Sequence, residues 1–192
     1  NSIPDAAHAT LDILDLKPAA IELIDDILWE STRGQIAFKE TRALLGLDDH
    51  PCKAILIVEF FEDIDDRIAQ LSRRDIGVRK LVVTDAREME MVWALRKAGL
   101  SLLTGCKGSS KPVPGIEDVA VPPQRLPDYV NGLLGIFDRL GLEGSFYGHA
   151  ASGLLHVRPV LDLHRAEDVA RYRQVSDEVA ALVLQVKGSV SA

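Results

Sequence analysis

The stretch that most restricts the fold is FYGHAASGLLHVRP, residues 146–159. Aromatic and apolar residues flank it on both sides and favour extended chain, whereas the small residues at 150–153 are typical of a turn. We therefore expect two antiparallel strands that reverse at residues 150–153. This pairing makes an antiparallel sheet part of the fold. It also places His149 and His156 near the ends of neighbouring strands, close enough to share a ligand.

The rest of the chain alternates between strand and helix patterns. The uninterrupted apolar run in CKAILIVEFF predicts a buried strand, and Asp25, Asp63 and Asp85 each stand where a helix cap is expected. No glycine-rich nucleotide fingerprint follows any strand. The order predicts an α+β fold in which a ferredoxin-like antiparallel sheet carries helices on one face, with two ferredoxin-like halves within a domain over residues 1–192. The other predicted strands cover residues 19–23, 78–84 and 118–121, and the predicted helices cover 4–14, 63–73, 86–98, 125–140 and 166–187, with a loop over most of 100–123.

Composition excludes several classes of function. The chain has 192 residues, enough for one well-buried domain, and a net charge of -7 from 22 basic and 29 acidic residues. Nucleic acids and anionic membranes call for a basic surface, so neither is an expected partner. No apolar run approaches the ~20 residues of a membrane span. Only two cysteines, Cys52 and Cys106, are present, which favours a reducing, cytoplasmic compartment.

The two histidines leave two interpretations open. Imidazoles are common ligands of zinc, manganese and iron, and the small residues between His149 and His156 leave room for a substrate atom, so the pair is a candidate metal site. The alternative is structural, with one ring capping a strand and the other bound to a carbonyl group. Spacing alone favours this alternative, because no third ligand stands nearby in the sequence.

Three further groups carry charge that a small anion could use. Arg96, on a predicted helix, could hold a carboxylate through two parallel hydrogen bonds, or it could lie on a solvated helix face. Lys111 follows a Gly-Ser-Ser loop that could bind an anion or simply be exposed. Glu117 and Asp118 could supply a general base, although Asp118 is equally typical of a turn. Ser152 lacks the pattern of a hydrolase nucleophile.

Four blocks taken in order resemble one family. They are PAAIELID at 18–25, VWALRKAGLSLL at 92–103, KPVPGIEDVAVPPQRLPDYV at 111–130 and YGHAASGLLHVRP at 147–159. Together they are similar to the C-terminal, substrate-side domain of FAD-linked oxidases of the glycolate oxidase and D-lactate dehydrogenase type. The subgroup that is fused to an iron–sulfur half is the most similar. The resemblance covers nearly the whole chain, and four ordered blocks are more specific than any single motif.

The resemblance assigns roles to individual residues. It implies that His149 and His156 bind a divalent cation, although Ser152 and Leu154 stand where the metal-dependent relatives carry Asp and Asn. It also implies a substrate-binding set, in which Arg96 holds the substrate carboxylate. That set is Arg96, Lys111 and Arg158.

The resemblance further implies that FAD is held mainly by a domain outside this chain. The run GSVSA at residues 188–192 is similar to one that continues into a Gly-Glu-His-Gly motif, so we expect the third metal ligand and the catalytic base beyond Ala192. The chain is then expected to be a piece of a longer enzyme and to be inactive alone. An iron–sulfur cluster, a homodimer and peripheral membrane association would be properties of that parent.

The predicted function is the substrate-binding domain of an FAD-dependent D-2-hydroxy-acid dehydrogenase, which oxidises the hydroxy acid to the 2-oxo acid. Glycolate, D-lactate and D-2-hydroxyglutarate all remain candidate substrates, and the metal and the electron acceptor are open. The alternative is a stand-alone ferredoxin-like module that binds a small ligand without catalysis. A flavin-binding half encoded in the same reading frame would exclude this alternative.

Overall fold

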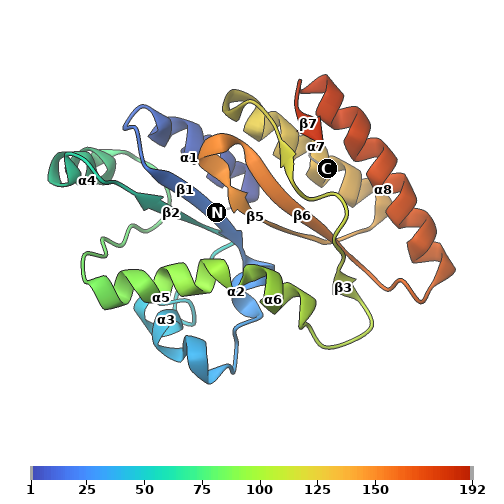
Figure 1. Ribbon diagram of the computed structural model, residues 1–192, viewed down its shortest axis with the longest axis horizontal. Coiled ribbons are helices and arrows are strands. Elements are labelled where there is room, and N and C mark those ends of the chain that lie inside the picture. Colours follow the sequence, from blue (N-terminus) through green and yellow to red (C-terminus); the bar gives the residue numbers. More distant parts are fainter. Residues whose placement is uncertain (1, 191–192) are drawn as a thin grey trace.

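The computed structural model describes residues 2–190 as an antiparallel sheet with helices against both of its faces (Figure 1). Seven strands belong to the sheet, in the order β2-β1-β5-β6-β4-β7, with β3 paired beside β4 on the same strand, β6. This confirms the predicted α+β class. The strands are β1 (Ala20–Asp25), β2 (Ala54–Glu59), β3 (Lys111–Pro112), β4 (Val119–Ala120), β5 (Gly144–His149), β6 (Leu154–Leu161) and β7 (Ser189–Val190).

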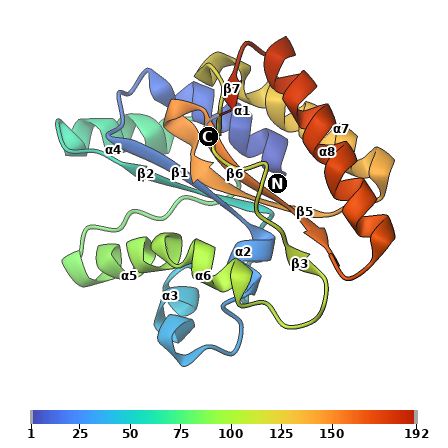
Figure 2. The same cartoon turned by 45° about the vertical axis from the view of Figure 1, so that its right-hand side comes forward.

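The helices form two layers, one on each face of the sheet, as Figure 2 also shows. Helices α1, α7 and α8 pack on one face, and α2, α3, α5 and α6 lie under the other. The expectation that helices cover one face is therefore corrected, while the division into two ferredoxin-like halves stays a prediction. The helices are α1 (Ile3–Leu14), α2 (Asp26–Glu30), α3 (Lys39–Leu44), α4 (Ile64–Arg73), α5 (Ala86–Lys97), α6 (Gly99–Thr104), α7 (Leu126–Leu140) and α8 (Ala166–Gln185).

Each helix layer has its own hydrophobic core, because successive side chains of a strand point to opposite faces of the sheet. On β1, Leu23 packs in the first core with α1, α7 and α8, and the next residue, Ile24, packs in the second core. On β5, Phe146 and Tyr147 divide in the same way. The second core is the smaller one, and the candidate site lies on the same face of the sheet.

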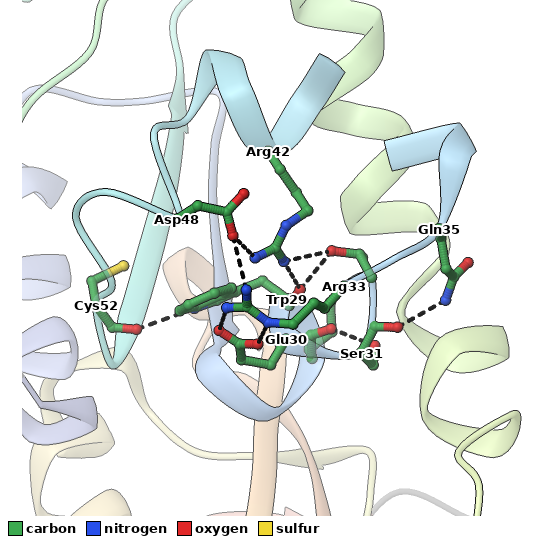
Figure 3. A network of polar contacts seen from close by, with 10 residues as sticks. Trp29, Glu30, Ser31, Arg33, Gln35, Arg42, Asp48 and Cys52 are labelled. Atoms are coloured by element: carbon green, nitrogen blue, oxygen red, sulfur yellow. Dashed lines mark hydrogen bonds and ion pairs between the residues drawn. The ribbon is translucent and has the colours of Figure 1, made fainter. Parts of the chain in front are cut away.

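A polar network stabilises the lower layer around Trp29 (Figure 3). The buried Arg42 guanidinium lies 5.4 Å from the centre of the Trp29 ring and donates to the Trp29 carbonyl oxygen at 2.9 Å. It also pairs with Asp48 at 2.5 Å. The indole nitrogen of Trp29 donates to the carbonyl oxygen of Cys52. These bonds tie α2 to α3 and to the loop that precedes β2.

Most predicted elements are confirmed, and the exceptions have physical causes. Residues 78–84 form no strand, and Val78 and Val82 are exposed at 71% and 53%. Strand β2 is only half-buried because it lies at the sheet edge. Asp63 stands before α4 but its side chain makes no capping bond. The predicted loop over residues 100–123 holds helix α6 and strand β3 in addition to the expected short strand.

Candidate functional site

The candidate site lies on the sheet face that meets α5 and α6. Glu22 on β1 is directly opposite His149 on β5, and Tyr147 on β5 is directly opposite His156 on β6. Arg158 is two residues further along β6 and therefore points to the same side as His156. The strand register alone thus gathers five polar or aromatic side chains on one face.

Small residues make the reversal between β5 and β6 tight. A short 3-10 turn at residues 150–152 ends at Gly153, which has a φ of 72°. Gly148 has a φ of 154°, and a Cβ atom there would lie 2.5 Å from the carbonyl oxygen of Leu154. A side chain at position 148 would therefore push the two strands apart. The reversal predicted at residues 150–153 is confirmed, and it fixes how far apart the two histidines stand.

The two imidazoles face each other edge to face, with ring centres 5.7 Å apart. Each ring is held by a carboxylate through the same nitrogen, because His149 Nδ1 lies 2.7 Å from Glu22 Oε1 and His156 Nδ1 lies 2.7 Å from Asp118 Oδ1. Burial lowers the pKa of His156, and the negative charge of Asp118 opposes that shift. In both rings Nε2 is the nitrogen that these carboxylates do not occupy.

Arg96 reaches this face from helix α5 and is buried, which excludes the solvated helix face that was its alternative. Its Nε donates to Glu22 Oε2 at 2.7 Å, and its guanidinium carbon lies 5.4 Å from the centre of the Tyr147 ring. The Arg96 Nη2 is buried and has no hydrogen-bond partner within residues 2–190. One turn earlier on α5, Trp93 donates to Glu59 on β2. The helix is therefore tied to the sheet at two points, and a donor of Arg96 is left for a ligand.

Arg158 is a second buried guanidinium on the same face. It is 2% exposed and lies 5.9 Å from the centre of the Tyr147 ring, and its Nη2 is 3.2 Å from Glu117 Oε2. Its Nε and Nη1 are buried without a hydrogen-bond partner in the described part of the chain. The loop that carries Glu117 is held by Tyr172 of α8, whose hydroxyl donates to the carbonyl oxygen of Pro114 at 2.6 Å.

Lys111 lies apart from the other predicted residues. It is exposed on β3, opposite Leu161 at the end of β6. Leu161 is five positions beyond His156, which is roughly 17 Å at the ordinary rise of a strand. The structure brings Arg96, Arg158 and both histidines to one face of the sheet and places Lys111 at its far end, so the role of Lys111 stays a prediction.

Sequence patterns missed the residue that connects these groups, Glu22. It is 6% exposed and bonds to both Arg96 and His149. A single carboxylate inside the apolar strand AIELID was a usable signal, because carboxylates are rarely buried without a partner. Asp118, which was equally well explained as a turn residue, is the partner of His156.

The histidine pair fits a divalent metal in its donor chemistry. Metal-bound histidines commonly donate their other ring nitrogen to a carboxylate, which fixes the tautomer and the ring orientation. Glu22 and Asp118 hold His149 and His156 in this manner. Residues 2–190 contain no group of three His, Cys, Asp or Glu side chains arranged to hold a metal ion. Within the described residues, metal binding by His149 and His156 therefore stays a prediction.

Comparison with protein-family models identifies the architecture. Residues 1–192 match the model described as FAD linked oxidases, C-terminal domain. The chain belongs to this family. In addition, it is 35% identical over 176 residues to a D-2-hydroxyglutarate dehydrogenase of Haemophilus influenzae, with 85% of this chain and 16% of that protein covered.

Two further relatives carry the same name. The D-2-hydroxyglutarate dehydrogenase of Escherichia coli is 34% identical over 177 residues, which cover 85% of this chain and 17% of that protein. The one of Pseudomonas putida is 30% identical over 205 residues, which cover 97% of this chain and 20% of that protein. The chain thus spans about a fifth or less of the length of these relatives.

Helices α2 and α5 do not offer the kind of N-terminus that binds the phosphate-carrying half of FAD. Pyrophosphate sites commonly use a glycine-rich turn that leads into a helix and leaves its first N–H groups free. Here Asp25 caps α2 by accepting from Leu28 N, and Asp85 caps α5 by accepting from Arg87 N and Glu88 N. The first turns of both helices are therefore occupied by the chain's own carboxylates. Separately, no helix within residues 2–190 is long and apolar enough to cross a membrane.

Proposed function

We propose that this chain forms the substrate-binding side of an FAD-dependent D-2-hydroxy-acid dehydrogenase. The observation that carries the proposal is the buried Arg96 guanidinium, which has an unpartnered Nη2 and is linked through Glu22 to His149. A guanidinium in this state is suited to bind a carboxylate. A histidine pair on the same face is suited to act on a neighbouring hydroxyl group. FAD, when bound by the rest of the enzyme, would accept the two electrons.

A dicarboxylate such as D-2-hydroxyglutarate is the substrate that we favour over glycolate and D-lactate. The face carries two buried guanidiniums, Arg96 and Arg158, and both retain donors without a partner. Both guanidinium carbons lie within 6 Å of the centre of the Tyr147 ring. Two carboxylates on one substrate would match two guanidiniums. The names of the bacterial relatives point to the same substrate.

The chain's own residues have separable tasks in this proposal. Arg96 binds and orients the carboxylate beside the reacting carbon, with Glu22 holding the guanidinium from behind. Arg158 binds the distant carboxylate, and Lys111 adds positive charge at the end of β6. His149 and His156 would hold a divalent metal through Nε2, and the metal would lower the pKa of the substrate hydroxyl group. A third metal ligand, the catalytic base, an iron–sulfur half and a homodimer stay predictions.

Flavin reduction in the complete polypeptide that carries this chain tests the proposal. Arg96→Ala should lower kcat/KM for D-2-hydroxyglutarate by about 10- to 150-fold, because a hydrogen bond to a charged group contributes roughly 1.5–3 kcal/mol. KM should rise and kcat should fall, since the guanidinium also orients the reacting carbon.

Arg87→Ala is the matched control. Arg87 stands on the same helix but is exposed, and it pairs with Glu40. Its loss should leave the kinetics of flavin reduction unchanged. Wild-type rates in Arg96→Ala, or no reduction of the wild-type flavin by any 2-hydroxy acid, would refute the proposed function.

A further inference from the structure

Glu22 occupies an unusual position between the two halves of the candidate site. It lies in the middle of the sheet on β1 and is 6% exposed. Its Oε1 is 2.7 Å from His149 Nδ1, and its Oε2 is 2.7 Å from Arg96 Nε. Each oxygen of one buried carboxylate therefore holds a different functional side chain, one from the neighbouring strand and one from helix α5.

We propose that Glu22 is a positioning residue that fixes the tautomer of His149 and the orientation of Arg96 at the same time. This inference rests on the proposed function, because it assigns a supporting role at that site. Glu22 itself touches neither substrate nor cofactor. It acts through the two side chains that do.

The direction of the hydrogen bonds follows from the chemistry of the three groups. Arg96 can only donate, and an ionised carboxylate can only accept. Glu22 Oε2 therefore accepts from Arg96, and where Oε1 also accepts, a neutral His149 ring must place its proton on Nδ1. The lone pair of His149 then lies on Nε2, where it can accept a proton or bind a metal. On the other side, use of Arg96 Nε leaves Nη2 without a partner.

The variant Glu22→Gln gives a sharp test because a glutamine side chain offers one acceptor and one donor group in place of two acceptors. Arg96 cannot become an acceptor, whereas neutral His149 can exchange its tautomer. We expect the amide oxygen to face Arg96 and the amide NH₂ to face His149 Nδ1. The imidazole proton should therefore move to Nε2, which abolishes the free lone pair at that nitrogen.

The tautomer of His149 can be measured directly by long-range ¹H–¹⁵N correlation NMR on the ¹⁵N-histidine-labelled chain. The spectra are recorded at about pH 8.5, roughly two units above the ordinary histidine pKa of about 6.5. The His149 resonances are assigned as those that disappear from the spectrum of the His149→Gln variant. The wild-type chain should show the Nδ1–H form and Glu22→Gln the Nε2–H form.

A double variant separates tautomer control from general damage. In Glu22→Gln with Arg96→Met, the amide oxygen no longer has to serve Arg96 and can accept from His149 again. The Nδ1–H form should then return. Glu59→Gln is the matched control, because Glu59 also ties the sheet to α5 by accepting from Trp93, whereas within residues 2–190 it is Glu22 that bonds to His149. It should leave the His149 tautomer unchanged.

Zinc titration by calorimetry gives a second readout that uses the metal alone. It compares the wild-type chain with Glu22→Gln, Glu59→Gln and the double variant. Removal of an outer-shell partner commonly weakens metal binding 10- to 100-fold. Glu22→Gln should show a loss of about that size, Glu59→Gln none, and the double variant a partial recovery.

The inference and the proposed function fail in different ways. Two results overturn the inference: an Nε2–H tautomer in the wild-type chain, or an unchanged Nδ1–H form in Glu22→Gln. The wild-type result decides the matter even if the variant does not fold. If the NMR spectra show the expected tautomers while 2-hydroxy acids fail to reduce the flavin of the wild-type enzyme, the role of Glu22 stands and the proposed function is rejected.

Discussion

Asp25 is the most deeply buried carboxylate with a defined structural task, and it gives a quantitative test of the fold. It ends β1 and caps α2, because Oδ1 accepts from Leu28 N at 3.0 Å. The same side chain accepts from Ser145 Oγ at 3.0 Å and from Phe146 N at 2.7 Å, which connects it to β5. One carboxyl group thus joins two strands and a helix.

Replacement of Asp25 by alanine removes all three contacts. Loss of a helix cap costs about 1 kcal/mol, and each buried donor left without a partner costs roughly 1–3 kcal/mol. Part of this cost is offset, because burial already penalises the charged carboxylate. We expect the free energy of unfolding to fall by about 2–5 kcal/mol. For a chain of this size, that corresponds to a decrease in Tm of roughly 5–15 °C.

Urea denaturation followed by circular dichroism measures this change, with Asp26→Ala as the control. Asp26 is adjacent in the sequence, but its carboxylate pairs with exposed Lys53 at the surface. Its replacement should cost less than about 1 kcal/mol, as is usual for an exposed ion pair. If Asp25→Ala were destabilised by no more than Asp26→Ala, the assignment of Asp25 as a buried junction would be refuted.

The same residue predicts a dependence of stability on pH. Burial raises the pKa of Asp25 to about 7, against three hydrogen bonds that lower it. The native state therefore keeps a proton that the unfolded state, with a pKa near 3.9, releases. The stability from this difference is fully present below about pH 4 and is lost as the pH rises through about 7. Asp25→Asn cannot titrate, so wild type should lose up to about 4 kcal/mol more than the variant between pH 4 and pH 8.

Two further predictions concern the strands that carry the histidines. Gly148→Ala should destabilise the chain by roughly 1–3 kcal/mol, because its Cβ would meet the carbonyl oxygen of Leu154 at 2.5 Å and its φ is 154°. Thermal unfolding measures this change, and unchanged stability would contradict the prediction. Asp118→Asn should lower the pKa of His156 further, because burial already lowers it and the Asp118 charge opposes that shift. An NMR titration of His156 in a chelator-containing buffer that shows an increase would contradict the second prediction.

Local sequence signals predicted those elements whose formation depends on nearby residues. The predicted caps Asp25 and Asp85 begin α2 and α5, and the apolar run at residues 54–59 is β2. The hairpin at residues 144–161 also depends on short-range features, namely small turn residues between β-forming flanks. In each case the side chains that determine the structure lie within a few residues of it.

The errors arose where long-range contacts decide the structure. Residues 78–84 have a strong strand composition, but a strand needs a partner, and here the segment connects α4 to α5 with Val78 and Val82 exposed. Helix α6 follows α5 directly at Gly99, so a glycine that was expected to end one helix begins another. A Cβ atom at position 99 would lie 2.9 Å from Leu28 Cδ1 and 3.5 Å from the Tyr147 ring, so a larger residue there would require the Leu28 side chain to shift.

The site shows the same division between local and long-range information. The hairpin placed the His149 and His156 rings on neighbouring strands, which a short-range pattern could predict. The carboxylates that hold those rings come from 127 residues earlier, Glu22, and from a loop before β4, Asp118. No local pattern connects such distant positions. The sequence could therefore indicate the candidate residues, but not the carboxylates that hold them.

The two-layer architecture explains why the candidate site needs a residue such as Glu22. The histidines belong to the sheet, whereas Arg96 belongs to a helix that packs against it, so any sliding of α5 would change the distance between the Arg96 guanidinium and the imidazoles. The contacts of α5 with Glu22 and Glu59 oppose this motion. Of these two, only Glu22 also contacts a histidine. Glu22 bonds directly to both Arg96 and His149, and for this reason its replacement by glutamine should affect substrate binding and the histidine tautomer together.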